Sequence, residues 1–239
     1  MRPRHVTGPL FRLRGLIISN VWVLDGGPGD RWVIDSGHPL ERLTVLAGLR
    51  AIGFAPTDFT GVLLTHRHSD HAGNAAFLRN KLGLRIFAHR ADAEVLAGKA
   101  RAPHLVAATR DPLANAFVAI ENRAPSHVPI DRALEDGESV GSLEVHHAPG
   151  HTAGSALFLH ATSSSLLSGD ALLAAVPPLT LIQRMCLPSP DFSDDLDAAL
   201  DSLRRLHRAG VESALGSRAP DPRRRASRSG ASARSLIDQ

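Results

Sequence analysis

The sequence predicts a mixed α/β chain folded as a four-layer αββα sandwich. Two β-rich regions occur, one before residue 90 and one after residue 138, and helical segments follow the strands of each. A sheet buries its two faces against another sheet or against helices, so this order favours two stacked sheets with helices outside. With 43% hydrophobic residues in 239, the chain can bury such a core as one domain.

The first region alternates short strands with amphipathic helices. Segments rich in β-branched and aliphatic residues predict strands, and they lie at 16–25, 31–35, 61–65 and 85–88. Apolar residues that recur every three or four positions predict helices, and these lie at 40–52, 73–82 and 90–96. The sequence Gly-Gly-Pro-Gly-Asp at 26–30 predicts a hairpin loop between the first two strands.

The second region contains further strands and one long helix. Its expected strands lie at 139–147, 156–160, 164–167 and 211–215, and its expected helix at 195–206. Between the two regions, residues 99–129 carry four prolines among apolar residues, which is typical of a partly helical flap. We expect this flap and residues 176–191 to form apolar walls of a pocket.

The chain ends in a segment of different composition. Residues 218–239 hold six arginines and two aspartates, so the formal net charge of +3 leaves −1 for the rest of the chain. We expect one globular domain over residues 1–217 and a disordered Arg/Ser-rich tail over 218–239. A near-neutral body offers no surface that follows a phosphate backbone, so a specific nucleic-acid function is not expected.

Cysteine content and the lack of long apolar runs indicate the cellular setting. Cys186 is the only cysteine, which excludes an intrachain disulfide. No run of 18 apolar residues occurs, and residues 1–14 lack the small-residue cleavage pattern of a secretory signal. We therefore expect a cytoplasmic protein with no membrane contact. The sequence leaves its oligomeric state open.

A cluster of histidines directly follows the expected strand at 61–65. His66, His68, Asp70 and His71 form the pattern H-x-H-x-D-H. Imidazole nitrogens and carboxylate oxygens that converge in one tight turn suit Zn²⁺ or a similar divalent ion. A solvated polar turn is the alternative interpretation, and three histidines in six residues argue against it. The pattern predicts a metal-binding loop.

Two further residues at strand ends are candidate ligands. His151 lies in a loop rich in glycine and proline after the expected strand ending at 147, and Asp170 follows the apolar strand at 164–167. A carboxylate in that position is costly unless it is exposed, paired or bound to a cation. Because both residues follow strands, a sheet sandwich can bring them to the same edge as the H-x-H-x-D-H loop.

These motifs, in order and spacing, closely resemble those of the metallo-β-lactamase superfamily of hydrolases over about residues 16–216. The motifs are the H-x-H-x-D-H hexad, Pro-Gly-His-Thr at 149–152, Ser-Gly-Asp at 168–170 and Val-Ile-Asp-Ser-Gly at 33–37. The resemblance implies an αββα fold. It also implies a first metal at His66, His68 and His151, a second at Asp70 and His71, and a bridging Asp170. Asp35 would orient a ligand by hydrogen bonding.

One element typical of the superfamily is missing. Its members usually carry a Gly-His-Gly turn after the last helix, whereas this chain has Gly216 followed by Ser217 and Arg218, and no histidine after His207. Two explanations stay open: a reading-frame change in the gene, or a variant with a weakened second metal site. Because a ligand of the second site is lost, we expect the first site to keep its metal, the affinity of the second site to fall and turnover to be impaired.

The resemblance implies a hydrolase that attacks a carbonyl with a metal-activated water. Asp70 and Asp170 are the expected catalytic groups, which orient the water and accept its proton. The expected cofactor is Zn²⁺, one or two ions, with iron or manganese as alternatives. The expected partner is a small molecule with an ester, thioester or lactone bond. An iron-dependent sulfur dioxygenase and a non-catalytic binding module are the alternative functions.

Overall fold

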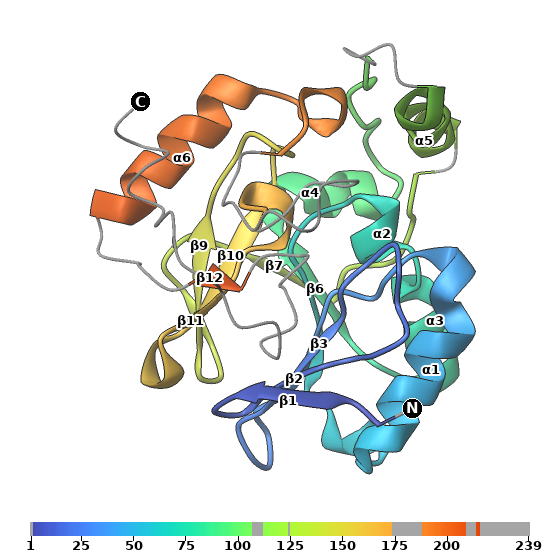
Figure 1. Ribbon diagram of the computed structural model, residues 1–239, viewed down its shortest axis with the longest axis vertical. Coiled ribbons are helices and arrows are strands. Elements are labelled where there is room, and N and C mark those ends of the chain that lie inside the picture. The colour runs from blue at the N-terminus through green and yellow to red at the C-terminus, as the bar shows by residue number, and fades with distance from the viewer. Residues whose placement is uncertain (1, 107–111, 124, 174–187, 209–213, 216–239) are drawn as a thin grey trace, which may run out of the picture.

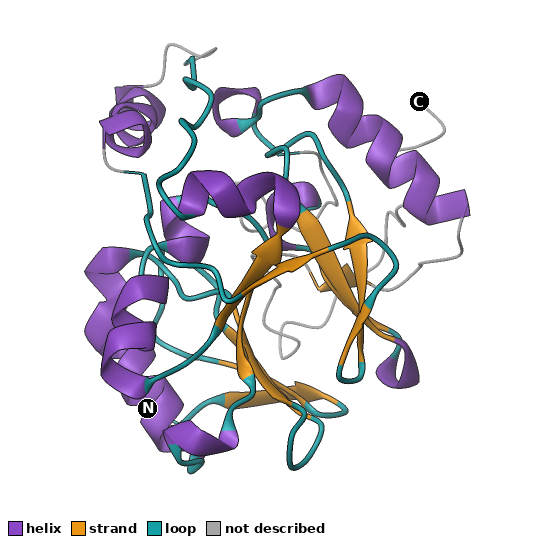
Figure 2. Cartoon of the chain, turned by 180° about the vertical axis from the view of Figure 1, so that it is seen from behind, coloured by secondary structure: helices purple, strands orange, loops and turns teal. Residues whose placement is uncertain are grey.

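The computed structural model of the chain describes residues 2–106, 112–123, 125–173, 188–208 and 214–215. Two sheets pack face to face, with α1 and α3 outside one sheet and α6 outside the other (Figure 1). The view from behind shows the same order of layers (Figure 2). The predicted four-layer αββα sandwich is therefore confirmed.

The first sheet has seven strands in sequence order, and it changes from antiparallel to parallel at its centre. Strands β1 to β4 pair as antiparallel neighbours, and β4 to β7 pair in parallel. The strands are β1 (Arg4–Thr7), β2 (Leu10–Arg12), β3 (Trp22–Asp25), β4 (Arg31–Ile34), β5 (Gly61–Leu64), β6 (Ile86–His89) and β7 (Arg132–Leu134). The parallel strands end at one edge of the sheet, and the loops at such an edge commonly carry the functional residues.

The second sheet has five strands in the order β12-β11-β10-β9-β8. Its strands are β8 (Ser139–Val140), β9 (Leu143–His147), β10 (Ala156–His160), β11 (Ser165–Leu167) and β12 (Ala214–Leu215). A backbone hydrogen bond of 2.8 Å runs from the nitrogen of Ala156 to the carbonyl oxygen of Thr65. It ties the start of β10 to the end of β5, so the two sheets meet beside the histidine-rich loop.

The helices lie outside the sheets and at the edge where the parallel strands end. They are α1 (Arg42–Ile52), α2 (Ser69–Ala72), α3 (Ala75–Leu82), α4 (Arg90–Leu96), α5 (Pro112–Arg123) and α6 (Leu196–Arg208). Short 3₁₀ turns lie between other elements: η1 (Pro39–Glu41), η2 (Pro56–Asp58), η3 (Ala161–Ser163), η4 (Gly169–Ala171) and η5 (Pro190–Phe192). Helix α1 ends at Gly53, whose φ of 94° suits a left-handed C-cap.

Side chains alternate between core layers along the central strands. In β5, Leu63 packs between the two sheets, while Val62 and Leu64 pack under α1 and α3. In β10, Phe158 faces the other sheet, whereas Leu157 faces the layer that contains α6. Since successive residues of a strand point to opposite faces, strands covered on both sides must be apolar throughout. This explains the continuous apolar run at 61–64.

The predicted strand at 16–25 begins only at Trp22. The Glu41 carboxylate accepts hydrogen bonds from the backbone nitrogens of Ile17, Ile18 and Ser19. These donors are therefore satisfied by a side chain instead of a neighbouring strand, and the chain stays irregular there. Strands β1, β2 and β7 were not predicted; all three have four residues or fewer.

The predicted helix at 73–82 starts at Ala75, and a separate turn, α2, precedes it. The side-chain amide of Asn74 donates to the carbonyl oxygens of Ser36, Gly37 and His38, so it holds the loop after β4 against this junction. In the flap, the predicted partly helical character corresponds to α5. The predicted tail at 218–239, Cys186 and most of the predicted wall at 176–191 lie outside the described residues.

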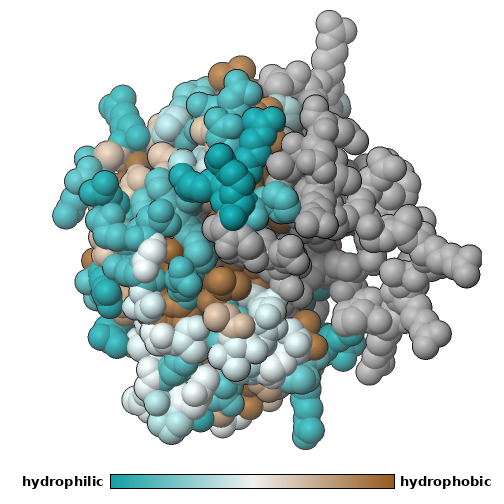
Figure 3. All heavy atoms as spheres, turned by 90° about the vertical axis from the view of Figure 1, so that its left-hand side faces the viewer, coloured by the Kyte–Doolittle hydropathy of each residue, from teal (hydrophilic) through white to brown (hydrophobic). Residues whose placement is uncertain are grey.

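The outer side of α6 is polar. Asp197, Asp201, Arg204 and Arg205 are exposed there, and hydrophilic side chains cover the upper part of the described face in Figure 3. The opposite side of the helix buries Leu203 and Leu206 against the second sheet. Among the described residues, no helix is long and apolar enough to cross a membrane.

We expect replacement of Leu63 by Ala to destabilise the fold by about 2–5 kcal/mol, because it leaves a cavity between the two sheets. Leu63 is fully buried, whereas Leu43 is 77% exposed. The matched control Leu43→Ala should change the free energy of unfolding by less than about 0.5 kcal/mol. Denaturant titration measures both values, and equal effects would contradict the inter-sheet core.

Candidate metal centre

The H-x-H-x-D-H loop turns sharply where β5 ends and α2 begins. His68 is the N-cap of α2 with extended backbone, and its carbonyl oxygen accepts hydrogen bonds from the nitrogens of His71 and Ala72. The turn leaves no room for a side chain at Gly73, where a Cβ would lie 2.2 Å from the carbonyl oxygen of Ser69. The local sequence thus folds the loop so that His66, His68 and His71 are all buried.

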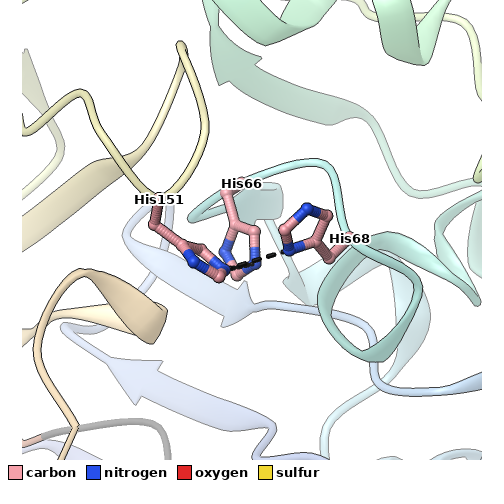
Figure 4. Close-up of side chains that lie close together, drawn as sticks. All are labelled: His66, His68 and His151. Atoms are coloured by element: carbon pink, nitrogen blue, oxygen red, sulfur yellow. Dashed lines mark hydrogen bonds between the residues drawn. The ribbon is translucent and has the colours of Figure 1, made fainter. Parts of the chain in front are cut away.

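His66, His68 and His151 point their ring nitrogens at one another (Figure 4). Nδ1 of His68 lies 3.0 Å from Nε2 of His151, which lies 3.1 Å from Nε2 of His66. His151 is 83 residues from His68 and comes from the loop between β9 and β10. The structure therefore brings together three of the predicted ligands from two different sheets.

The charge state of these three histidines suits a metal ion. Burial, together with the neighbouring histidines, lowers the pKa of His66 and of His68 well below the usual value. Burial also lowers the pKa of His151 to about 4. Metal binding requires neutral imidazoles, and three neutral rings with converging nitrogens cannot satisfy one another by hydrogen bonds alone. A divalent cation fits this cluster.

The remaining nitrogens of the rings determine how the rings are oriented. Nδ1 of His151 lies 3.3 Å from the hydroxyl of Ser193, and Nδ1 of His66 lies 3.1 Å from the hydroxyl of Thr65. Such contacts fix the tautomer and orientation of a metal-binding histidine. Nε2 of His68 is buried and has no hydrogen-bond partner among the described residues.

A second cluster lies beside the first. Nε2 of His71 is 3.1 Å from an oxygen of Asp170 and 3.4 Å from an oxygen of Asp70. The ligand atoms of His66, His71 and Asp170 lie within 4.8 Å of one another, as do those of His66, His68 and His151. Nε2 of His151 is 4.0 Å from Asp170, so this carboxylate faces both groups. All six predicted ligands thus lie at one edge of the sandwich.

Asp35 hydrogen-bonds to His71 and orients it, as the family resemblance implied. Its carboxylate lies 2.7 Å from Nδ1 of His71 and accepts hydrogen bonds from the nitrogen and hydroxyl of Thr65. Asp35 has a φ of 61°, which is uncommon for a residue other than glycine. Burial acts to lower the pKa of His71, but the carboxylates of Asp70, Asp35 and Asp170 outweigh it and raise that pKa well above its usual value.

A cavity of about 500 Å³ lies against Arg67 and His68. Its walls come from the end of α4, residues 98–105 and the segment from Glu121 to His127. Val95 and Leu105 contribute apolar surface, while Glu121 and Arg101 contribute charge, so the described wall is mixed rather than apolar. Both oxygens of Glu121 accept a bond from the nitrogen of Ser69, and burial raises the pKa of Glu121.

Several residues that support the candidate ligands were not predicted from the sequence. They are Thr65, Asp92, Glu121, Ser193 and Asp194, which hydrogen-bond to the ligand-bearing loops. Their positions along the chain carry no spacing pattern. The one available signal was a buried carboxylate in an apolar context, and Asp92, at 1% exposure within α4, fits that description.

A sequence model of the metallo-beta-lactamase superfamily matches residues 14–222 of the chain. This match extends over most of the sequence and includes the H-x-H-x-D-H loop, His151 and Asp170. The chain therefore belongs to the metallo-beta-lactamase superfamily, as the motifs predicted.

Curated relatives are named hydrolases. The probable metallo-hydrolase YybB of Bacillus subtilis (strain 168) is 26% identical over 183 residues, which cover 77% of this chain and 72% of that protein. A hydroxyacylglutathione hydrolase of Pseudomonas paraeruginosa is 33% identical over 156 residues, which cover 63% of this chain. The match spans only 41% of that longer protein. Family, relatives and the histidine-rich site together define the class as a metallo-hydrolase.

Solved structures share the fold. A metallo-beta-lactamase from Cronobacter sakazakii superposes with a TM-score of 0.64 at 20% identity, over 91% of this chain and 80% of that one. A metallo-beta-lactamase family protein from Thermus thermophilus gives 0.62 at 27% identity, over 96% and 78%. The protein TTHA1623, in a di-iron-bound form, gives 0.57 at 27% identity, over 90% and 91%. The family and the histidine-rich group of this chain together imply that the site uses a divalent metal.

A pair of stacked histidines joins the end of β6 to the end of β9. The rings of His89 and His147 are 3.8 Å apart and nearly parallel, at 12°. His89 is 3% exposed and caps α4 by accepting a bond from the nitrogen of Ala91. Burial and the neighbouring His147 lower the pKa of His89 to about 4. His89 therefore packs against His147 in its neutral form at neutral pH.

We expect His89 to make folding acid-sensitive. Its pKa is lower in the folded chain than the usual value of about 6.5, so its contribution to stability is fully present above that pH and is lost as the pH falls toward 4. The variant His89→Asn keeps a capping acceptor but does not titrate. Its free energy of unfolding should fall less steeply than the wild type's between pH 7 and pH 4.5; equal slopes would contradict the lowered pKa.

Proposed function

We propose that this metallo-hydrolase cleaves an ester, thioester or lactone bond of a small molecule with a water molecule activated at the histidine cluster. One observation carries the proposal: Nε2 of His151 lies 3.0 Å from Nδ1 of His68 and 3.1 Å from Nε2 of His66. All three rings are buried, and their lowered pKa values keep them neutral. No serine, threonine or cysteine is needed as a nucleophile in such a site, because a divalent cation would lower the pKa of a bound water to about 7.

The carboxylates provide the acid–base groups. Asp70 and Asp170 are 28% and 20% exposed at their side chains, so both can reach a water and a substrate at the edge of the sandwich. Asp170, which faces both clusters, is suited to orient the attacking water and to accept its proton. Asp70, 3.4 Å from Nε2 of His71, is the second carboxylate suited to orient the water and accept its proton, and a cation held by His71 and Asp70 would stabilise negative charge on the leaving group.

Zn²⁺, as one or two ions, is the proposed cofactor, with iron or manganese as alternatives. Three imidazoles are typical ligands of catalytic zinc. The mixed set of His71, Asp70 and Asp170 also suits iron, and TTHA1623 is described in a di-iron-bound form. Metal analysis must therefore quantify iron and manganese as well as zinc.

Thioesters are the favoured substrate class. Several relatives are named hydroxyacylglutathione hydrolases, and a hydroxyacylglutathione is a thioester. The cavity beside His68 offers apolar surface from Val95 and Leu105 for an acyl group. We propose a small-molecule substrate, no specific nucleic-acid or membrane partner, and a cytoplasmic location. A sulfur dioxygenase and a binding module that lacks turnover are the alternatives that the experiments below separate.

The His151→Ala variant should lose tight metal binding and hydrolysis together, because it removes one of three converging nitrogens. Mass spectrometry of the metal content and rates on ester, thioester and lactone panels measure both. The control His5→Ala changes an exposed histidine near the N-terminus and should retain both properties. Wild-type protein that binds metal but turns over no substrate would favour the binding module, and oxygen consumption would favour the dioxygenase.

We expect the chain to hold one metal ion tightly and a second weakly. Residues 208–239 contain no histidine, and among the described residues the second cluster joins only His71, Asp70 and Asp170 beside His66. Isothermal titration with Zn²⁺ should resolve one tight and one weaker equivalent. Two equally tight equivalents would contradict the weakened second site.

A further inference from the structure

The second residue of the H-x-H-x-D-H loop is a buried arginine. Arg67 lies between His66 and His68, and its side chain is 5% exposed. Its guanidinium lies between two carboxylates: Asp92 of α4 on one side and Asp194, just before α6, on the other. The proposed chemistry does not use this arginine.

Asp194 holds Arg67 by two bonds. Nη1 and Nη2 of Arg67 donate to the two oxygens of Asp194 at 3.1 and 2.8 Å. The same carboxylate accepts a bond of 3.1 Å from the nitrogen of Ala153, in the loop of His151. Asp194 therefore bridges the loop that carries His66 and His68 and the loop that carries His151.

Asp92 makes a parallel bridge. One oxygen accepts bonds from the backbone nitrogen of Arg67 at 3.0 Å and the hydroxyl of Thr152 at 2.7 Å. The other accepts the nitrogen of Gly154 at 3.0 Å and lies 3.4 Å from Nη1 of Arg67. Each aspartate thus contacts both ligand-bearing loops, and the guanidinium fills the space between them.

The surroundings leave little freedom for these loops. A Cβ at Gly154 would lie 2.4 Å from the nitrogen of Asp92, and one at Gly150 would lie 2.2 Å from the nitrogen of Ala199 in α6. The nitrogen of Asp194 also donates to the carbonyl oxygen of His151 at 3.2 Å. A shift of Asp194 would therefore move the backbone of His151 directly.

We propose that Arg67, Asp92 and Asp194 form a clamp that sets the spacing of His151 from His66 and His68, and that Arg67 and Asp194 are positioning residues of the metal centre. The clamp rests on the proposed metal site formed by these histidines. A planar guanidinium can donate hydrogen bonds to two carboxylates at once. The ammonium group of a lysine cannot reproduce this geometry. Loss of the clamp should loosen the histidine geometry and weaken metal binding.

The test uses Asp194→Asn and Arg67→Lys, which preserve most of the side-chain volume, and the double variant. The control is Asp201→Asn on the exposed side of α6, where Asp201 pairs with Arg204 and is 74% exposed. Zn²⁺ affinity is measured by chelator competition, and the visible spectrum of the Co²⁺-substituted protein reports ligand geometry. Circular dichroism and the melting temperature of the metal-free proteins report folding.

We expect each clamp variant to weaken the tight Zn²⁺ site by about tenfold or more, with an altered Co²⁺ spectrum and retained secondary structure. The loss of Zn²⁺ affinity in the double variant should be no larger than the product of the two single losses, because both substitutions break the same contact between Arg67 and Asp194. Asp201→Asn should match the wild type. Clamp variants that melt earlier but bind Zn²⁺ within twofold of the wild type would overturn the proposal and show a purely structural role.

The two proposals fail in different ways. If the wild-type protein binds no divalent metal, the proposed metal site and the clamp fail together. If the wild type binds metal and the clamp variants bind it equally well, only the clamp fails.

Discussion

The structure depends on segments that are distant in sequence holding three buried imidazole nitrogens within 4.8 Å of one another. This arrangement requires the two sheets to meet at one edge, and the bond from the nitrogen of Ala156 to the carbonyl oxygen of Thr65 joins them there. The alternating core of β5 and β10 fixes the register that keeps this edge in place. The fold and the site are therefore determined by the same contacts.

The two clusters differ in the charge they hold without a metal. His66, His68 and His151 are kept neutral by burial, whereas the pKa of His71 is raised by the surrounding carboxylates. The carboxylates of Asp70, Asp35 and Asp170 therefore favour positive charge at the second cluster, which a bound cation would also supply.

The sequence was sufficient to predict the layers, and the six candidate ligands that it indicated lie together at one edge of the structure. Apolar runs indicate strands buried on two faces, and H-x-H-x-D-H concentrates donors within one turn. The supporting groups could not be predicted, since Asp92, Ser193 and Asp194 contact the ligand loops only through tertiary packing. The same applies to residues 16–21, where the Glu41 carboxylate replaces strand pairing with side-chain hydrogen bonds.

The backbone of Asp35 shows what this centre requires of the fold. A non-glycine residue at a φ of 61° costs roughly 1–3 kcal/mol, and a glycine would adopt that conformation without strain. The carboxylate, however, accepts bonds from Nδ1 of His71 and from the nitrogen and hydroxyl of Thr65. Glycine would leave these buried donors unpaired at a cost of about 1–3 kcal/mol for each, so relief of the backbone strain alone would not yield a hardier protein.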